Sequence, residues 1–425
     1  MSERHNLLER AWTELETIVG SEHMRHASMD DVIDETLPVG VIAPGTAQEI
    51  ARVLQYCSSA GVSVVPRGGG TKLGLGNPPQ KADFILSTAR LDRVVEHVWG
   101  DMTTTVEAGC TIDRLQQALA EHGQRLALDP VRPEAATVGG VLATAESGTL
   151  RIRYGAVRDL VLGVELALAD GSVIKAGGKV VKNVAGYDLT RLVIGSLGTL
   201  GVITRAVFRL HPIPVATATY STVLTSLAEA NKLALAILDS QLVYTGLQLR
   251  AERPDQIALE VRFEGIPESL QDQFARLNRL VAGRTFLECS CGVWTARQQL
   301  FADAAKSVVC KFGVLPSQIG SLCEAIFQYA SGPDVAAFVV AQGTGLAEVR
   351  FEAARVPLFM GVLNGLRREV ERLDGTMVVR HCPALLKEAL DVWGTPKYAL
   401  SLMQEIKGKF DPARTLNPGR FVGAI

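Results

Sequence analysis

The sequence lacks the features that would place it among nucleic-acid-binding or membrane-spanning proteins. It has no basic run with interleaved aromatic residues, and its formal net charge is only -2, so general attraction to nucleic acid or to an anionic membrane is not indicated. No apolar run approaches the roughly 20 residues that span a bilayer. The N-terminus also lacks the apolar core of a signal peptide. We therefore expect a cytoplasmic chain without a transmembrane segment.

Cysteine is too sparse and too irregular to build a scaffold. The seven cysteines are an odd number without regular spacing, which argues against a disulfide framework or an iron–sulfur cluster held by this chain alone. Cys289 and Cys291 form the only close pair, with no second cysteine or histidine pair beside them. Free thiols and no metal site are therefore expected.

Glycine, by contrast, is concentrated in loops at the ends of predicted strands. The first loop follows an apolar strand at 62–65 and reads Pro66-Arg67-Gly68-Gly69-Gly70-Thr71-Lys72. Successive glycine N–H groups can form a nest that binds anions, phosphate above all. The stretch does not match G-x-x-x-x-G-K-[ST], and Asn77-Pro78-Pro79 prevents the helix that would follow G-x-G-x-x-G. It predicts a dinucleotide pyrophosphate site; an ordinary glycine turn is the alternative.

Two further glycine-spaced stretches strengthen this interpretation. The second follows Asp129-Pro130 and reads Ala136-Thr137-Val138-Gly139-Gly140-Val141-Leu142-Ala143-Thr144, which we expect to be a loop with small residues and free hydroxyls. The third is Gly195-Ser196-Leu197-Gly198-Thr199-Leu200-Gly201-Val202-Ile203, which runs into a strand at 202–210. Three such segments at strand ends can converge on one extended ligand.

The 425 residues, 47% of them hydrophobic, are enough for two or three domains. A first domain with strands and helices ends at His211-Pro212-Ile213-Pro214. From there the pattern is strand–helix–strand–strand–helix, and it then repeats with strands at 308–314, 335–341, 347–351 and 376–380 around helices at 317–329 and 357–373. This order predicts an antiparallel sheet with helices on one face. The second domain has no glycine loop, so we expect it to cover the cofactor.

The ordered set of glycine motifs, with Arg153-Tyr154-Gly155 and Leu416-Asn417-Pro418-Gly419, resembles the FAD-linked oxidases of the vanillyl-alcohol oxidase type. Lys182-Asn183-Val184-Ala185-Gly186-Tyr187-Asp188 is most similar to the smaller FAD-binding subunit of bacterial glycolate oxidase. The resemblance covers roughly 35–215 closely and the tail from 395 to 422, and the middle loosely.

The resemblance implies an α+β fold. A PCMH-type FAD-binding domain of two subdomains would occupy 35–214, after an N-terminal helical segment at 1–34. An α+β cap domain with an antiparallel sheet would follow at 215–395, and a segment at 396–425 would dock back on the FAD-binding domain.

The same resemblance assigns cofactor-binding residues. The stretch from Gly68 to Thr71 would hold the pyrophosphate of FAD, the stretch from Thr137 to Gly140 would pass beside the ribityl chain, and Val202 and Ile203 would line the adenine end. The full predicted set is Arg67, Gly68, Gly69, Gly70, Thr71, Lys72, Pro130, Thr137, Val138, Gly139, Gly140, Thr144, Gly201, Val202 and Ile203. FAD should be bound non-covalently, because relatives with covalent flavin have histidine at the position of Thr71.

The chain departs from the hydroxy-acid dehydrogenases of this family in its histidines. It has no His-Gly-Asp-Gly-Asn stretch. His381 is the one histidine expected in the cap domain, where it could take a hydroxyl proton while Arg380 holds a carboxylate. A structural histidine and a surface arginine are the alternative. Arg153, Tyr154 and Arg158 could equally face the flavin or lie at a domain interface.

Three functions are compatible with these motifs. The first is an FAD-dependent dehydrogenase for a small 2-hydroxy acid, glycolate or D-lactate. The second is a non-catalytic or electron-relaying FAD-binding subunit, which would depend on a catalytic flavoprotein partner and an iron–sulfur partner and could lie at the inner membrane through them. The third is a scaffold that has lost its cofactor, which the intact glycine loops disfavour.

Overall fold

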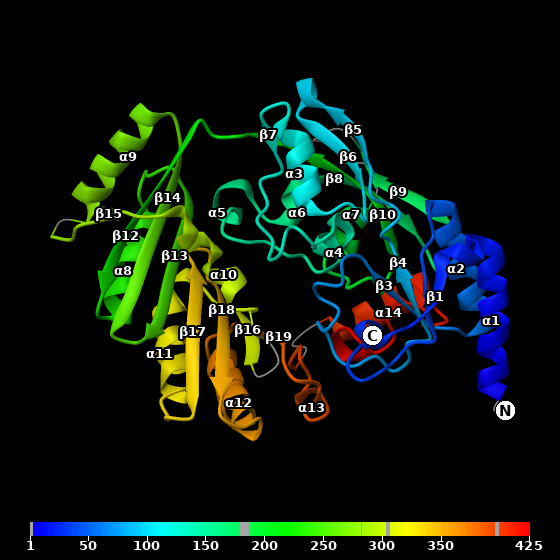
Figure 1. Ribbon diagram of the computed structural model, residues 1–425. Helices are drawn as coiled ribbons and strands as arrows, with labels where there is room; N and C mark the ends of the chain where they lie inside the picture. Colours follow the sequence, from blue (N-terminus) through cyan, green and yellow to red (C-terminus); the bar gives the residue numbers. More distant parts are fainter. Residues whose placement is uncertain (1–2, 179–186, 282, 303–306, 396–398) are drawn as a thin grey trace. The chain divides into compact units, whose positions relative to one another are not determined.

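The computed structural model describes residues 3–178, 187–281, 283–302, 307–395 and 399–425. The chain divides into two compact units (Figure 1). Unit 1 comprises Met1–Gly148, Gly155–Ile213 and Thr395–Ile425, and unit 2 comprises Thr149–Tyr154 and Pro214–Gly394. Two details differ from the predicted boundaries. The N-terminal segment is part of unit 1, and the short stretch Thr149–Tyr154 belongs to unit 2.

The first sheet of unit 1 delivers the glycine loop. Its strand order is β1 (Met24–His26), β2 (Gly40–Ile42), β4 (Phe84–Ser87) and β3 (Val64–Arg67), with β2, β4 and β3 parallel. The helices α1 (Glu3–Val19) and α2 (Ala47–Ala60) pack on it through a shared apolar core. Helix α2 begins after Thr46, whose side chain accepts a hydrogen bond of 3.1 Å from the Glu49 N–H, and the sequence Thr46-Ala47-Gln48-Glu49 has the capping-box pattern that marks such a start. The helix ends at Gly61, whose φ of 67° suits glycine.

The second sheet of unit 1 is antiparallel and has five strands. Their order is β5 (Val94–Val98), β6 (Thr103–Glu107), β10 (Val202–Arg209), β8 (Val161–Ala167) and β9 (Val173–Gly177). The short elements around it are α3 (Ile112–Ala120), β7 (Gln124–Arg125), α4 (Val138–Ala143), α6 (Val157–Leu160), α7 (Leu189–Val193) and β11 (His211–Pro212). Strand β5 had no sequence signal, because Glu96 and His97 interrupt its apolar pattern. Residues 179–186, which hold most of the Lys182 to Asp188 motif, lie outside the described residues.

Unit 2 is built on one antiparallel sheet of eight strands. The order is β15 (Leu287–Glu288), β12 (Ala216–Leu224), β14 (Gln256–Gly265), β13 (Tyr244–Arg253), β17 (Val335–Gln342), β18 (Leu346–Ala353), β16 (Ser307–Gly313) and β19 (Thr376–His381). Four helices pack on one face around a single apolar core: α8 (Leu227–Leu238), α9 (Pro267–Leu280), α11 (Ile319–Tyr329) and α12 (Pro357–Arg372). The predicted fold class, an α+β chain with an antiparallel cap sheet, is confirmed.

The remaining helices of unit 2 are short. Helix α5 (Arg151–Tyr154) lies against β13, which is why Thr149–Tyr154 groups with this unit. The others are α10 (Ala296–Gln299) and α13 (Ala384–Lys387). Across the described residues of both units, no helix combines the length and apolar character needed to cross a membrane.

The C-terminal segment belongs to unit 1 and contacts the first sheet of that unit at β3. It consists of α14 (Leu400–Phe410) and a tail whose residues run beside β3. The Val64 N–H donates to the Thr415 carbonyl over 2.8 Å, and the Asn417 N–H donates to the Val64 carbonyl over 3.0 Å. The tail is therefore held by a single parallel bridge, Val64 to Leu416, beside the strand that carries the glycine loop.

Candidate functional site

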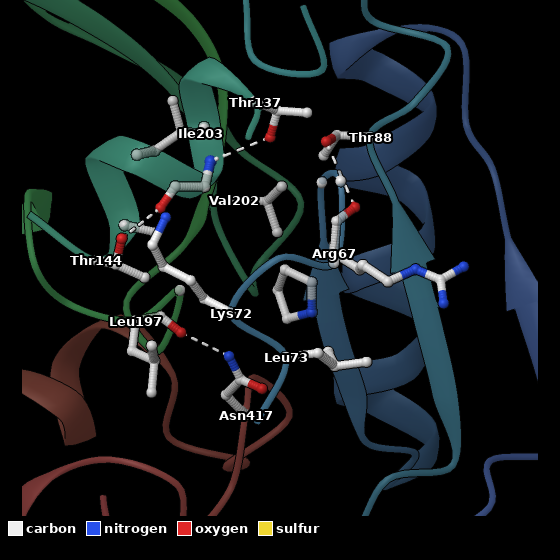
Figure 2. Close-up of a pocket in the computed structure, with 18 of the residues that line it drawn as sticks. Arg67, Lys72, Leu73, Thr88, Thr137, Thr144, Leu197, Val202, Ile203 and Asn417 are labelled. Carbon is white, nitrogen blue, oxygen red and sulfur yellow. Dashed lines mark hydrogen bonds between the residues drawn. The ribbon is translucent and has the colours of Figure 1, made fainter. Parts of the chain in front are cut away.

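A pocket in unit 1 gathers the glycine-rich segments (Figure 2). It encloses about 800 Å³ of space, part of it open to solvent. Its lining comes from residues 66–73, Thr88, Thr137, Gly139, Gly140, Ala143, Thr144, residues 196–198, residues 201–203 and the tail residues Asn417 and Arg420. The structure thus brings together every predicted cofactor residue except Pro130 and Val138, which are buried and do not line the pocket.

The first glycine loop presents unused donors to this pocket. Within the described part of the chain, no residue accepts a hydrogen bond from the backbone N–H groups of Gly68, Gly69, Gly70 and Thr71. Gly69 and Gly70 are exposed, and Gly70 has a φ of 72°. Successive N–H groups of this kind form an anion-binding nest. The loop therefore fits the pyrophosphate of a dinucleotide cofactor.

The glycines also have a packing role that the sequence did not indicate. A Cβ atom on Gly69 would lie 1.7 Å from the carbonyl oxygen of Ala135, and one on Gly68 would lie 2.0 Å from Oγ1 of Thr137. Real Cβ atoms essentially never approach a backbone atom so closely. Any side chain at these positions would force the first two glycine segments apart.

The second glycine segment is a short helix, α4, where we expected a loop. Its N-cap is Thr137, whose Oγ1 accepts a hydrogen bond of 3.3 Å from the Gly140 N–H. The Val138 and Gly139 N–H groups donate to the carbonyls of Cys110 and Ala108. The chain itself thus uses these three N–H groups, and the segment offers the pocket a surface of small side chains instead.

The tail supplies pocket residues that the sequence analysis did not assign. Asn417 and Leu197 both line the pocket in left-handed backbone conformations, with φ values of 48° and 54°. The Asn417 side-chain amide donates to the Leu197 carbonyl over 2.5 Å, as Figure 2 shows. Buried Arg420 donates to the carbonyls of Leu73 and Leu75. The sequence pointed to this segment through the resemblance that includes Leu416-Asn417-Pro418-Gly419, which implied a tail docked on the FAD-binding domain.

A buried ion pair fixes this tail. The Lys407 ammonium lies 2.6 Å from the Asp411 carboxylate and donates to the carbonyls of Thr199 and Leu416, each over 2.9 Å. The same carboxylate accepts hydrogen bonds from the Thr415 and Leu416 N–H groups. Lys407 thereby ties the tail to the third glycine segment.

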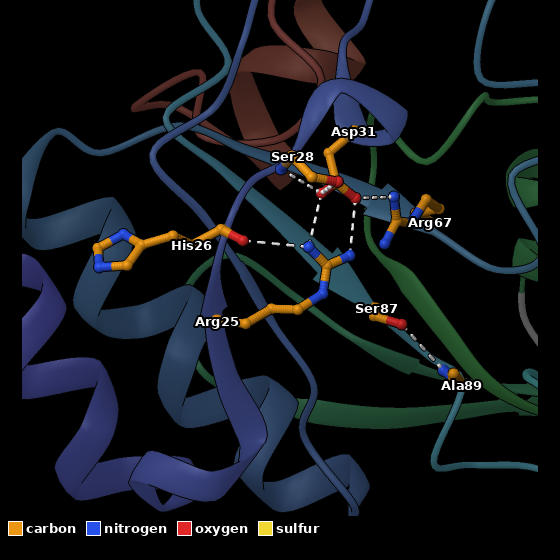
Figure 3. A network of polar contacts seen from close by, with 7 residues as sticks. All are labelled: Arg25, His26, Ser28, Asp31, Arg67, Ser87 and Ala89. Atoms are coloured by element: carbon orange, nitrogen blue, oxygen red, sulfur yellow. Dashed lines mark hydrogen bonds and ion pairs between the residues drawn. The ribbon is translucent and has the colours of Figure 1, made fainter.

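The two predicted cations of the first loop are paired with carboxylates of the chain. The Arg67 guanidinium donates to buried Asp31 over 2.6 Å, and Arg25 donates to both oxygens of the same carboxylate (Figure 3). The hydrogen bonds from Arg25 are the largest cause that lowers the pKa of Asp31. Lys72 pairs with the buried carboxylate of Glu146. In Figure 2 the Arg67 side chain points away from Thr144 and Leu197, so its lining of the pocket comes from its backbone.

The predicted catalytic pair lies in unit 2. Arg380 is buried and donates from Nη1 to Glu348 over 3.2 Å, with its guanidinium carbon 5.8 Å from the centre of the Phe301 ring. His381 is the last residue of β19 and pairs in register with Val309. Arg380 is therefore not the surface arginine of the alternative interpretation. Whether either residue acts in catalysis stays a prediction.

The sequence also left open the roles of Tyr154 and Arg158, and the structure places these two residues in different units. The Tyr154 hydroxyl donates to Glu264 over 2.9 Å inside unit 2. Arg158 is exposed in unit 1, where its nearest carboxylate is that of Asp159 at 4.0 Å. Within the described ranges, no group of three or more histidine, cysteine, aspartate or glutamate residues has a geometry that could hold a metal ion.

Comparisons with known proteins agree with this site. Residues 38–177 match the family model described as an FAD binding domain. The chain is 27% identical over 421 residues to glycolate oxidase subunit GlcD of Bacillus subtilis, an alignment that covers 91% of this chain and 89% of that one. It is 39% identical over 173 residues to a D-lactate dehydrogenase of Archaeoglobus fulgidus, covering 40% of this chain but only 38% of the relative.

The fold has solved counterparts. A crystal structure of p-cresol methylhydroxylase with substrate bound superposes with a TM-score of 0.78 at 14% identity, covering 98% of this chain and 96% of that one. At this identity the likeness shows the fold alone. The FAD binding domain and the similarity to glycolate oxidase subunit GlcD confirm the predicted resemblance to FAD-linked oxidases, and FAD is the cofactor. The chain is an FAD-linked oxidoreductase with an FAD binding domain at residues 38–177, related to glycolate oxidase subunit GlcD and to D-lactate dehydrogenases.

Proposed function

We propose that this chain oxidises a small 2-hydroxy acid, either glycolate or D-lactate, with FAD as the electron acceptor. Binding of FAD is supported chiefly by the backbone N–H groups from Gly68 to Thr71, which line the unit 1 pocket and donate to no residue that the structure describes. The substrate class is supported by relatives named glycolate oxidase subunit, D-lactate dehydrogenase and D-2-hydroxyglutarate dehydrogenase.

The residues of unit 1 bind and orient the cofactor, which supplies the hydride acceptor when bound. The N–H groups of the first loop bind the pyrophosphate. Gly139 and Gly140 leave room beside α4, and Val202 and Ile203 contact the adenine end. Thr71 has no nucleophilic ring nitrogen, so FAD is held without a covalent bond.

The substrate requires a base and a carboxylate ligand. In the predicted arrangement His381 takes the proton of the substrate hydroxyl, and its neighbour Arg380 provides positive charge. Arg380 already donates to Glu348, so it would have to share its guanidinium between that carboxylate and the substrate.

The test is an anaerobic titration of the purified chain with glycolate, D-lactate and L-lactate, following the flavin absorbance. Bleaching by glycolate or D-lactate supports oxidation by this chain alone. A flavin that none of the three acids reduces would contradict it.

A second function is favoured by one sequence observation. The chain lacks the His-Gly-Asp-Gly-Asn stretch of the hydroxy-acid dehydrogenases, which suits a subunit that binds FAD and relays electrons without its own catalytic centre. It would then work in a glycolate oxidase-type complex, with a catalytic flavoprotein and an iron–sulfur partner, in the cytoplasm or at the inner membrane through those partners. Reduction of its flavin only after the partners are added would support this function.

A further inference from the structure

The thiols that reach solvent belong to two cysteines which are separated by one residue in the chain. Cys289 is half-buried and Cys291 is exposed, whereas the other five cysteines are buried. Burial is the main cause that raises the pKa of Cys57 and of Cys323 to about 12, so those thiols stay protonated and out of reach of dissolved reagents. Among the cysteines that the structure describes, a reagent in solution therefore meets a thiol at this pair.

Cys289 is fixed at the edge of the unit 2 sheet. It directly follows β15, and its N–H donates to the Thr219 carbonyl of β12 over 2.9 Å. Burial raises the pKa of its thiol, the Glu260 carboxylate raises it further, and the Arg250 guanidinium lowers it. At neutral pH Cys289 is therefore a protonated thiol that is held in one place.

Cys291 lies in a turn that can rearrange. It begins the 3₁₀ helix η4 (Cys291–Thr295), whose first turn is held by Ser290. The Gly292 N–H donates to Oγ of Ser290 over 3.1 Å, and the Val293 N–H donates to the Ser290 carbonyl over 3.4 Å. Since Ser290, Cys291 and Gly292 are exposed, water can replace these two hydrogen bonds at little cost.

The two sulfur atoms need such a rearrangement before they can bond to each other. Ser290 has an extended backbone, with φ −61° and ψ 140°, and in an extended chain residues two apart are separated by about 6.5 Å. A disulfide requires Cβ atoms at about 4 Å. A disulfide closed across Ser290 would therefore break its two hydrogen bonds to η4. Because it would be both strained and exposed, it would also be easy to reduce again.

We propose that Cys289 and Cys291 form a reversible oxidation site, which a hydroperoxide such as hydrogen peroxide converts into a disulfide. Cys291 loses its proton, and its thiolate attacks one peroxide oxygen. The O–O bond breaks, which leaves a sulfenic acid on Cys291 and a hydroxide that takes up the proton as water.

The second step closes the disulfide. The Cys289 sulfur attacks the Cys291 sulfur and displaces its hydroxyl group, which leaves with the Cys289 proton as a second water. Two thiols thus give up two electrons, and one hydrogen peroxide is reduced to two waters. Neither the flavin nor a hydroxy acid takes part, so the proposal is independent of the proposed function.

The structural change on oxidation is confined to the start of η4. The remainder of this helix is tied to the sheet, because Nε1 of Trp294 donates to Oγ1 of Thr219 over 3.0 Å. Nε2 of Gln248 also donates to the Val293 carbonyl over 2.9 Å. The disulfide therefore releases the first turn of η4 and leaves these anchors in place.

Mass spectrometry of the complete flavoprotein tests the site, because trypsin releases both cysteines in one peptide, Thr285–Arg297, which contains no other cysteine. The protein is treated with millimolar hydrogen peroxide, quenched with catalase, unfolded and alkylated with N-ethylmaleimide. The peptide should then carry no alkyl group and should be lighter than its dithiol form by two hydrogen atoms. Dithiothreitol added before alkylation should restore both alkylation sites. The peptides with Cys310 and Cys323 should be alkylated throughout.

Serine variants identify the two partners. Cys289→Ser and Cys291→Ser should each lose the disulfide completely, and in Cys289→Ser peroxide should carry Cys291 on to sulfinic acid, since no second thiol intercepts the sulfenic acid. Cys323→Ala, which removes a buried thiol, is the matched control and should form the disulfide as the unaltered chain does. Full alkylation of the unaltered chain after peroxide would overturn the proposal. So would sulfinic acid at Cys291 in place of the disulfide, or disulfide-linked dimers.

Hydrogen exchange of the oxidised and reduced proteins tests the rearrangement. The Gly292 and Val293 amides should exchange severalfold faster after oxidation, because both lose their acceptors on Ser290. The amides of β12 and β14 should exchange at the same rate in the two forms. Equal exchange at Gly292 and Val293 would contradict a disulfide closed across Ser290, and faster exchange throughout β12 would contradict a change confined to this turn.

Discussion

At the scale of single residues, Gly69 shows why a glycine loop has to be interpreted in three dimensions. In the sequence it indicates only a phosphate-binding turn, whereas in the structure it also allows the loop to touch the Ala135 carbonyl. Gly69→Asp would add a clash and a negative charge beside the nest, and we expect FAD binding at least about tenfold weaker. The ratio of flavin to protein absorbance after gel filtration measures this.

The control for that change is Gly74→Asp, which introduces the same carboxylate in the same loop. Gly74 is exposed, and a Cβ atom there would meet nothing within 4 Å. Normal flavin content in Gly74→Asp with a loss in Gly69→Asp would locate the effect in the nest. Equal flavin content in the two variants would refute the assignment of this loop.

Asp31 is a second residue whose role appears only in the structure. Its pKa is lowered mainly by the hydrogen bonds from Arg25, so its charge stabilises the fold above the pKa of the unfolded chain, about 3.9. This contribution is lost as the pH falls below that value toward the folded pKa. Asp31→Asn should therefore reduce the free energy of unfolding by about 1–3 kcal/mol at pH 7.

The difference between Asp31→Asn and the unaltered chain should shrink on going from pH 5 to pH 3. Urea denaturation at a series of pH values gives this difference. Asp30→Asn, which changes an exposed neighbour, should have little effect at any pH. A difference that stays constant down to pH 3 would show that the Asp31 charge does not stabilise the fold.

At the scale of elements, sequence patterns predicted the long, regular pieces well. The sequences Thr46-Ala47-Gln48-Glu49 and Ser226-Leu227-Ala228-Glu229 both have the capping-box pattern of a helix start. In the structure the Thr46 and Ser226 side chains accept hydrogen bonds from the Glu49 and Glu229 N–H groups at the starts of α2 and α8. Helix α4 was missed because Gly139-Gly140 disfavours a helix. The Thr137 cap and hydrogen bonds to the carbonyls of Cys110 and Ala108 help to stabilise it.

The C-terminal element offers a prediction about stability. Lys407→Met would leave the Asp411 carboxylate buried without its cation, and breaking a buried pair on one side costs about 3–5 kcal/mol. We expect a loss of this size in urea denaturation, together with weaker FAD retention, because the Lys407 ammonium also holds the Thr199 and Leu416 carbonyls. Lys409→Met removes an exposed lysine from the same helix and should change neither property. Equal stability of the two variants would contradict a structural role for the pair.

At the scale of the whole molecule, the candidate cofactor site joins distant parts of the chain. Its lining runs from Pro66 to Arg420, and the tail residues could be assigned to it only after the hydrogen bonds of Asn417 and Arg420 were known. The sequence does predict the first three segments, since each is a glycine motif at a strand end. The resemblance predicted that the tail would dock on the FAD-binding domain, but the sequence could not predict the bridge between Leu416 and Val64 of β3, because that contact depends on the folded sheet edge.

Because these segments meet only in the folded chain, FAD should bind the native state and not the unfolded one. The melting temperature of the apoprotein should then rise with FAD concentration, corresponding to about 2.7 kcal/mol of added stability at 100 times the dissociation constant. Scanning calorimetry of the apoprotein over a range of FAD concentrations measures the rise, and Gly69→Asp should show little of it.

Since Thr71 cannot bond to the flavin, acid precipitation of the holoprotein should leave all of the flavin in the supernatant. A melting temperature independent of FAD concentration, or flavin in the protein pellet, would mean that the pocket does not bind FAD in the reversible way proposed.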